Sequence, residues 1–87
     1  MLILCQQRDT IVNLDKVQAL NVHLENRREV CAWFDVNETN RNSVLLGKYN
    51  TESRATEVLQ EILVCYLNSN SNAVGFVKNS VYIMPEE

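Results

Sequence analysis

"LLGKYNTESRATEVLQEI", residues 45–62, passes from an apolar strand into a helix, and its local structure is the most clearly marked in the sequence. Thr51 is a natural N-cap, because its hydroxyl can accept a hydrogen bond from a free backbone N–H of the first helical turn. Glu52 places negative charge at the positive end of the helix dipole. Beyond Glu52, apolar residues recur at the i, i+3, i+4, i+7 spacing and polar residues take the opposite side. The stretch predicts a helix that begins at Glu52 and buries one face.

The segments on either side of this helix predict its end and the rest of the fold. Asparagine and serine at 68–72 compete for backbone hydrogen bonds, so the helix is expected to end near Leu67. Alternating apolar and polar residues predict strands, at 1–5, 10–14, 20–24, 30–36, 44–49, 73–77 and 80–84. A chain of 87 residues supports one core, hence one domain over 1–87. We expect an α+β fold, with a twisted antiparallel sheet of five to six strands and one helix, about 52–67, packed on one face.

Composition limits the classes of partner. The net charge is −3 and the eight basic residues are scattered, which argues against direct contact with nucleic acid. No segment approaches the roughly 20 apolar residues of a membrane span, and the apolar start is too short for a signal peptide, so no membrane partner is expected. Cys5, Cys31 and Cys65 lie in apolar runs without metal-binding or redox spacing and are expected to be reduced packing residues. These features favour a cytoplasmic protein.

Three motifs resemble a family of uncharacterised short proteins of low-GC Gram-positive bacteria and their prophages. They are "QQRDTIVNLDKV" near the start, the central "LLGKYNTESRATEVLQEI" and "VYIMPEE" at the end. The middle of the chain, from Leu20 to Asn42, departs from the family pattern. The resemblance implies a setting in bacterial mobile elements and a bacterial host cell. It transfers no site. The residues that carry it are Gly47, Tyr49, Thr51, Ala55, Val58, Leu59, Glu61, Ile62, Tyr82, Met84 and Pro85.

No residue pattern indicates catalysis, a cofactor or a metal. His23 is the only histidine, and it is better explained as an exposed strand residue than as part of a catalytic triad or metal site. Glu57 and Glu61 lie one turn apart on the polar helix face, as solvated surface residues do. Gly47 and Lys48 lack the glycine-rich spacing of a phosphate loop. We therefore expect no catalytic, cofactor-binding or metal-binding residues, and a protein that is not an enzyme.

The predicted strand register indicates a contact surface. Leu24 is expected opposite Val30, and Phe34 opposite both Leu20 and Leu46, which gives one apolar face for the helix to cover. The other face is half polar and aromatic, with Trp33 over Gly47, as binding surfaces are. It is either a protein contact or is closed over by the first hairpin or the last strand of the same chain. Its predicted contact residues are Asn21, His23, Trp33, Asp35, Leu45 and Tyr49.

These observations favour a non-catalytic binding protein of phage or prophage type. Its specific form would be an inhibitor of a bacterial defence system, similar to an anti-CRISPR protein, that contacts a protein partner and forms a homo-oligomer. One alternative is an oligomeric protein that binds a nucleotide signal between subunits, which would require basic residues to converge, such as Arg27, Arg28, Arg41 or Lys48. Another is a structural accessory protein of a mobile element.

Overall fold

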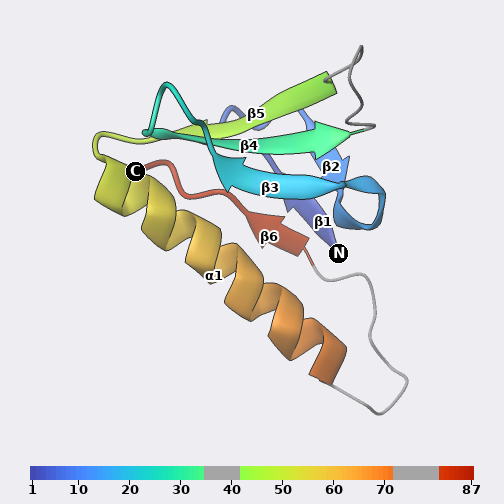
Figure 1. The fold of residues 1–87 in the computed structure, drawn as a ribbon. Coiled ribbons are helices and arrows are strands. Elements are labelled where there is room, and N and C mark those ends of the chain that lie inside the picture. Colours follow the sequence, from blue (N-terminus) through green and yellow to red (C-terminus); the bar gives the residue numbers. More distant parts are fainter. Residues whose placement is uncertain (35–41, 72–80) are drawn as a thin grey trace.

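The computed structural model describes residues 1–34, 42–71 and 81–87, of which 69–71 are described without their side chains. Within these ranges six strands and one long helix form an α+β fold, as predicted (Figure 1). The predicted strand at 73–77 lies outside the described residues. The elements in chain order are β1 (Leu2–Leu4), β2 (Ile11–Asn13), the 3₁₀ turn η1 (Leu14–Lys16), β3 (Ala19–Val22), β4 (Glu29–Phe34), β5 (Asn42–Lys48), α1 (Glu52–Ser71) and β6 (Val81–Ile83).

The strands form two sheets rather than one continuous sheet. The antiparallel sheet has the order β3-β4-β5, and the mixed sheet has the order β2-β1-β6. The first and last strands of the described chain run parallel side by side, which local sequence patterns do not reveal (Figure 1). Gln6, just past β1, donates its backbone N–H to the Leu46 carbonyl at 2.7 Å, but no ladder joins the two sheets there. The expected single antiparallel sheet is therefore replaced by two three-stranded sheets.

The register of the antiparallel sheet is shifted from the predicted one. Val22, not Leu24, lies opposite Val30, so Leu24 lies in the hairpin loop and is 80% exposed. A shift of two residues keeps each side chain on its predicted face. Between β4 and β5, Phe34 pairs with Asn42 instead of Leu46, and the register slips between Val30 and Cys31. Leu46 is the extra residue of this bulge and fills the core.

The helix begins where the sequence predicts and ends later. Thr51 caps it, since its Oγ1 accepts the Arg54 backbone N–H at 3.0 Å. The last turn reaches Ser71 rather than Leu67. Serine and asparagine each cost only about 0.5 kcal/mol in a helix relative to alanine, so a few of them do not stop a helix that is already formed. A glycine, which disfavours a helix more strongly, first follows at position 75.

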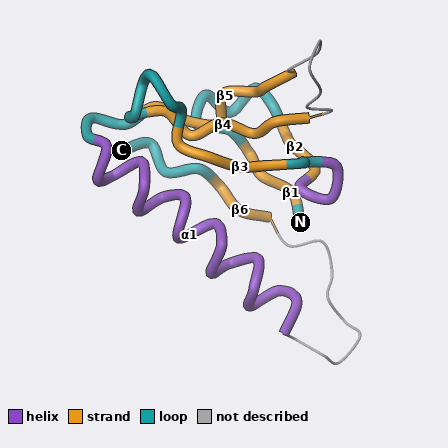
Figure 2. The backbone as a smooth tube through the Cα atoms, in the orientation of Figure 1, coloured by secondary structure: helices purple, strands orange, loops and turns teal. Residues whose placement is uncertain are grey.

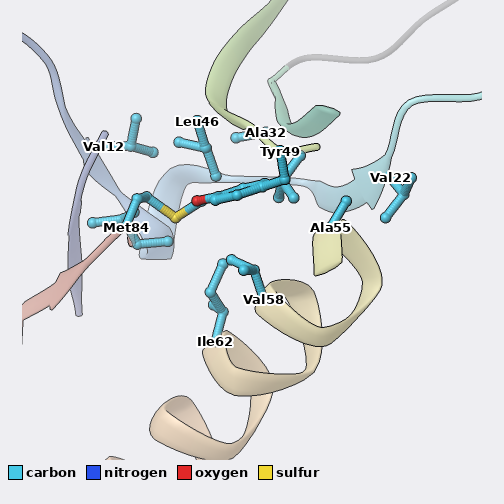
Figure 3. Packing of buried hydrophobic residues seen from close by; sticks show 11 residues of the cluster. Val12, Val22, Ala32, Leu46, Tyr49, Ala55, Val58, Ile62 and Met84 are labelled. Atoms are coloured by element: carbon cyan, nitrogen blue, oxygen red, sulfur yellow. The ribbon is translucent and has the colours of Figure 1, made fainter. Parts of the chain in front are cut away.

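One core joins the helix to both sheets. Ala55, Val58 and Ile62 from α1 are at most 1% exposed and point toward the strands (Figure 3). The antiparallel sheet contributes apolar side chains from all three strands, and the mixed sheet contributes Ile3 and Val12. Figure 2 shows the strands on one side of the molecule and α1 on the other, with its C-terminal half projecting beyond both sheets. The first part of the apolar helix stripe is thus the core face that its periodicity predicted, whereas Leu63, which the same spacing places on that face, is 56% exposed.

Candidate protein-contact surfaces

The outer side of the antiparallel sheet holds three of the six predicted contact residues. Trp33 Nε1 donates a hydrogen bond to Asn21 Oδ1 at 2.9 Å, and both side chains are half-buried. Leu45 lies on the same side across from Cys31 and is 44% exposed. We call Asn21, Trp33 and Leu45 the Trp33 face. The hydrogen bond satisfies the indole N–H, so this face presents a fixed ring with moderate exposure.

His23 has a local role beyond the end of β3. Its Nδ1 accepts the backbone N–H groups of Glu25 and Asn26, at 3.2 and 3.0 Å. The imidazole therefore closes the hairpin turn between β3 and β4. Asp35, another predicted contact residue, lies outside the described residues.

Tyr49 lies in the core, contrary to its predicted position on the outer face. It is 4% exposed, and its hydroxyl donates to the Pro85 carbonyl at 2.9 Å. The cause is the bulge at Leu46, because one extra residue in a strand reverses the face of every side chain that follows. Gly47 and Tyr49 consequently turn inward. Burial raises the pKa of the Tyr49 hydroxyl, which keeps it a hydrogen-bond donor.

A second surface of the described chain is almost entirely apolar. On the outer side of the mixed sheet, Leu4 lies between Ile11 and Ile83, and Leu2 lies between Asn13 and Val81. Ile11, Val81 and Ile83 are 65%, 54% and 56% exposed. We call Leu2, Leu4, Ile11, Val81 and Ile83 the aliphatic face. The solvent side of such a sheet is ordinarily polar, and contiguous exposed apolar residues indicate an interaction site.

Sequence reasoning missed the aliphatic face, although a signal for it was present. β1, β2 and β6 are apolar at alternate positions that point inward, as a sheet over a core requires, with Ile3, Val12 and Tyr82 in one row. Their remaining positions are also mostly aliphatic. A strand that is apolar on both sides needs cover on both sides, and only the inner side is covered by the described chain.

A groove runs between α1 and the segment that joins η1 to β3. It has a volume of about 760 Å³. Leu59, Leu63 and Tyr66 form its helix wall, and Leu14 and Leu20 stand opposite. Asp15 is the one charged residue among those that line it. We call this feature the helix groove; it is an apolar depression with a nearly uncharged lining.

The residues after β6 are held by a network of polar contacts. Gln6 Nε2 donates to the carbonyls of Pro85 and Glu86, at 3.3 and 2.9 Å. Arg8 Nη1 donates to the Met84 carbonyl at 2.8 Å, and Arg54 Nε donates to that of Glu87 at 3.0 Å. The same Arg54 pairs with Glu57 and Glu61 on the helix. These contacts fasten the end of the chain to β1 and α1.

One guanidinium bridges Glu57 and Glu61, whose side chains remain 64% and 43% exposed, as expected for surface residues. Arg54 Nη1 lies 2.9 Å from Glu61 Oε2, and Tyr82 donates its hydroxyl to Glu61 Oε1 at 3.3 Å. Burial, followed by the Glu61 charge, raises the pKa of Tyr82. A carboxylate that is neutralised by arginine and joined to a protonated phenol serves to link β6 to the helix.

The residues that carry the family resemblance have structural roles. They fill the core, cap the helix or hold the final segment. Tyr49, Ala55, Val58, Ile62 and Met84 are core residues, and Leu59 and Tyr82 pack against them. Gly47 makes room for the Tyr49 ring.

A nucleotide site between subunits would require basic residues to converge. Among the described residues, Arg27, Arg28 and Lys48 do not line a common cavity. Arg27 Nε is paired with Glu52 Oε1 at 2.6 Å. Arg28 and Lys48 are exposed at the same end of the antiparallel sheet, and Lys48 pairs across the strands with Glu29. Arg41 lies outside the described residues.

The three cysteine side chains are buried or half-buried, and none forms a disulfide within the described residues. Cys5 is 3% exposed, and its Sγ donates to Asp9 Oδ1 at 3.1 Å, a hydrogen bond that lowers the pKa of the Asp9 carboxyl. Burial raises the pKa of the Cys31 thiol, which disfavours the reactive thiolate. Cys65 is half-buried on α1. Within residues 1–34, 42–71 and 81–87, no three His, Cys, Asp or Glu side chains are grouped so that they could hold a metal ion.

No helix in the described ranges combines the length and the apolar character that crossing a membrane requires. In comparisons with known proteins, no family model, no curated protein and no solved structure matches the chain.

Proposed function

We propose that this protein is a non-catalytic binding protein that contacts a protein partner through the aliphatic face. The observation that carries the proposal is the set of three aliphatic side chains more than half exposed on the two outer strands of one sheet, around Leu2 and Leu4. Nucleic acids and anionic membranes fit this face poorly, because its side chains include no cation and the chain has a net charge of −3.

The energy available from this face sets the size of the complex. Full burial of one aliphatic side chain stabilises by about 1.5–3 kcal/mol. Since Ile11, Val81 and Ile83 are each more than half exposed, a partner that covers all three recovers roughly 3–5 kcal/mol on that scale. Association costs about 4–15 kcal/mol in lost freedom. The aliphatic face therefore acts as the centre of a larger contact, with the partner also touching the polar residues around it.

The family resemblance suggests the biological form of this binding. In that setting the protein is a prophage-type accessory protein in the cytoplasm of a bacterial host cell, and its target is a component of a defence system such as a CRISPR nuclease. This form rests on the setting and on the small acidic chain. Its test is phage plating on a CRISPR-immune host with and without expression of the protein. The proposal is supported if the protein protects the phage and the Ile83→Glu variant does not. Unchanged host immunity contradicts it.

Target binding is tested by affinity capture from nuclease-treated host lysate. Ile11→Glu and Ile83→Glu each place a charge on an outer strand of the mixed sheet. Leu24→Glu is the matched control, because Leu24 is an exposed aliphatic residue that belongs to neither face. We expect the parent and Leu24→Glu to retain the same proteins and both isoleucine variants to lose them, with circular dichroism unchanged.

The competing contact surface is the Trp33 face. Trp33→Ala, tested in the same capture experiment, is expected to keep its fold and its partners if the aliphatic face is the contact. Loss of the captured proteins in Trp33→Ala, with normal capture by Ile11→Glu and Ile83→Glu, would assign the contact to the Trp33 face instead. An unfolded Trp33→Ala variant would show that the ring is needed for the sheet.

A further inference from the structure

The helix groove has the edge of a sheet as one wall and a helix as the other. β3 forms the edge of the antiparallel sheet on the side of α1 (Figure 1). Ala19 and Leu20 of β3 line the groove on this side, and Leu59 and Leu63 of α1 line it across from them. An edge strand can offer backbone hydrogen bonds as well as side chains.

The backbone of β3 has hydrogen-bonding groups that β4 does not use. The His23 N–H donates to the Glu29 carbonyl at 2.9 Å, which makes these two residues a hydrogen-bonded pair. Such pairs alternate with non-hydrogen-bonded pairs along antiparallel strands, so the N–H and C=O groups of Val22 and Leu20 point away from β4. No residue in the described part of the chain forms a hydrogen bond with these outward groups of Leu20. A free donor and a free acceptor therefore lie at the rim of the groove.

The opposite edge of the same sheet is closed within the chain near Lys48. There the side-chain amide of Gln6 pairs with β5 as a backbone peptide group would. Its Oε1 accepts the Lys48 N–H at 2.8 Å, and its Nε2 donates to the Lys48 carbonyl at 3.0 Å. Proteins also protect edge strands with lysine or proline, and β3, with the sequence ALNV, contains neither. The edge of β3 is thus a place where a further strand can add.

The helix wall of the groove carries apolar side chains that lack full cover. Leu59, Leu63 and Tyr66 continue the stripe to which the buried Ile62 belongs. Leu63 is nevertheless 56% exposed, although side chains on such a stripe ordinarily face a core. The groove volume of about 760 Å³ is of the size that bound ligands occupy. The groove can therefore accept apolar side chains from a partner.

We propose that the helix groove binds an extended segment of a partner protein, which adds to β3 as an antiparallel fourth strand. The main chain of the segment pairs with Leu20, and every second side chain of the segment packs against Leu63 and its neighbours. Antiparallel pairing continues the pattern of this sheet and is the slightly more stable arrangement. The proposal extends beyond target binding through the aliphatic face, because it uses the other sheet.

Charge indicates which segment fits. Asp15 is the one charged residue of the groove lining, and no described residue forms an ion pair with it. It precedes β3, so it lies near the C-terminal end of an antiparallel segment. A lysine or arginine at that end can reach the Asp15 carboxylate, and the net charge of −3 favours a basic segment in general. The expected occupant has alternate aliphatic residues followed by a basic residue.

The test uses the synthetic peptide acetyl-Val-Thr-Val-Thr-Val-Lys-amide as the probe and the full chain as the receptor. In an NMR titration we expect saturable binding with a Kd below about 1 mM, together with slower hydrogen exchange of the Leu20 amide. Leu63→Glu should raise the Kd at least about tenfold. Leu67→Glu is the matched control, because Leu67 is an exposed leucine of the same helix outside the groove lining. Leu67→Glu and Ile83→Glu should bind the peptide as the parent does.

Modified peptides test the strand pairing and the charge separately. In the proposed register the valine N–H groups face β3 and the threonine N–H groups face away. N-methylation of the valines should therefore raise the Kd roughly tenfold, since each lost hydrogen bond contributes about 0.5–1.5 kcal/mol. N-methylation of the threonines should leave the Kd unchanged. Asp15→Asn should weaken binding of the lysine peptide about threefold, as for an exposed ion pair, and should not affect a peptide with glutamine in place of lysine.

Four results would overturn the proposal. They are no saturable binding by the parent, an equal loss of binding in Leu67→Glu, unchanged binding of the peptide methylated at its valines, and a Leu20 amide that is already protected before peptide is added. The last result would mean that this chain or a second copy already fills the groove. If Leu63→Glu fails to fold by circular dichroism, Leu63→Ala replaces it, with at least about a threefold rise in Kd expected and an unchanged Kd counting against the proposal.

Discussion

The contact between Gly47 and the Tyr49 ring gives a sharp test of the core. A Cβ atom on Gly47 would lie 2.7 Å from the Tyr49 hydroxyl oxygen and 3.0 Å from two ring carbons. The ring cannot easily move away, because Tyr49 is 4% exposed and its hydroxyl is bonded to the Pro85 carbonyl. Overpacking of this kind costs about 1–3 kcal/mol. We therefore expect Gly47→Ala to lower the free energy of unfolding by that amount.

Removing the hydroxyl should relieve part of this overlap. Tyr49→Phe alone loses one hydrogen bond, typically about 0.5–1.5 kcal/mol. The lower end is expected, since Gln6 Nε2 also donates to the Pro85 carbonyl, at 3.3 Å. In the double variant, the atom closest to the new methyl group is gone and the ring carbons remain. The variant that combines Gly47→Ala with Tyr49→Phe should lose about 0.5–1.5 kcal/mol less unfolding free energy than the sum of the two single losses. Such non-additivity is typical of residues in contact.

The assay is urea unfolding followed by circular dichroism for the parent, both single variants and the double variant. Thermal melting gives a second readout, in which 1 kcal/mol corresponds to about 4–8 °C in a domain of this size. Ser43→Ala on the exposed outer side of β5 is the control for a small substitution in the same strand. A Gly47→Ala variant as stable as the parent, or losses that simply add, would show that Gly47 does not make room for the ring.

Three further predictions concern the helix and β6. Ile62→Ala should cost about 2–5 kcal/mol of unfolding free energy because the Ile62 side chain is 1% exposed. Leu59→Ala should cost less because Leu59 is half-buried. Equal melting temperatures for the two variants would count against this ranking. Thr51→Ala should lose about 0.5–2 kcal/mol while Thr51→Ser stays nearly neutral in the same melts, and equal losses would exclude the capping hydroxyl. The pKa of Tyr82 is raised in the folded protein. Its contribution to the free energy of unfolding is therefore fully present below the unfolded pKa near 10 and is lost as the pH rises from there toward the folded pKa. Tyr82→Phe should therefore lose less stability than the parent between pH 9 and 11, and parallel losses would refute the assignment.

The helix is the element that the sequence predicted best. Its start at Glu52, its Thr51 cap and its buried stripe depend on contacts within a few residues, so local patterns contain the information. The α+β class follows from the same patterns. The end of the helix was predicted too early because the effect of serine and asparagine on a helix that is already formed was overestimated.

The details that the sequence did not predict depend on distant contacts. The bulge at Leu46 moves Tyr49 from the outer face to the core, and no local pattern signals an extra residue in one strand of a pair. The parallel pairing of β1 with β6 joins segments nearly a whole chain apart. The bulge removes Tyr49 from the predicted contact surface, and the parallel pairing creates the aliphatic face that the sequence analysis missed.

The pairing of β1 with β6 also sets an order of events during synthesis. β1 can meet β2 as soon as the short hairpin between them has left the ribosome, but its other edge must wait until residues 81–83 have emerged. Closing that long loop costs about 2 kcal/mol more than closing the hairpin, by the logarithmic dependence on loop length. The antiparallel sheet and the helix are complete before then. The nascent chain therefore waits with one edge of its first strand open, and a copy stalled before residue 81 would expose that edge to strand addition by a neighbour.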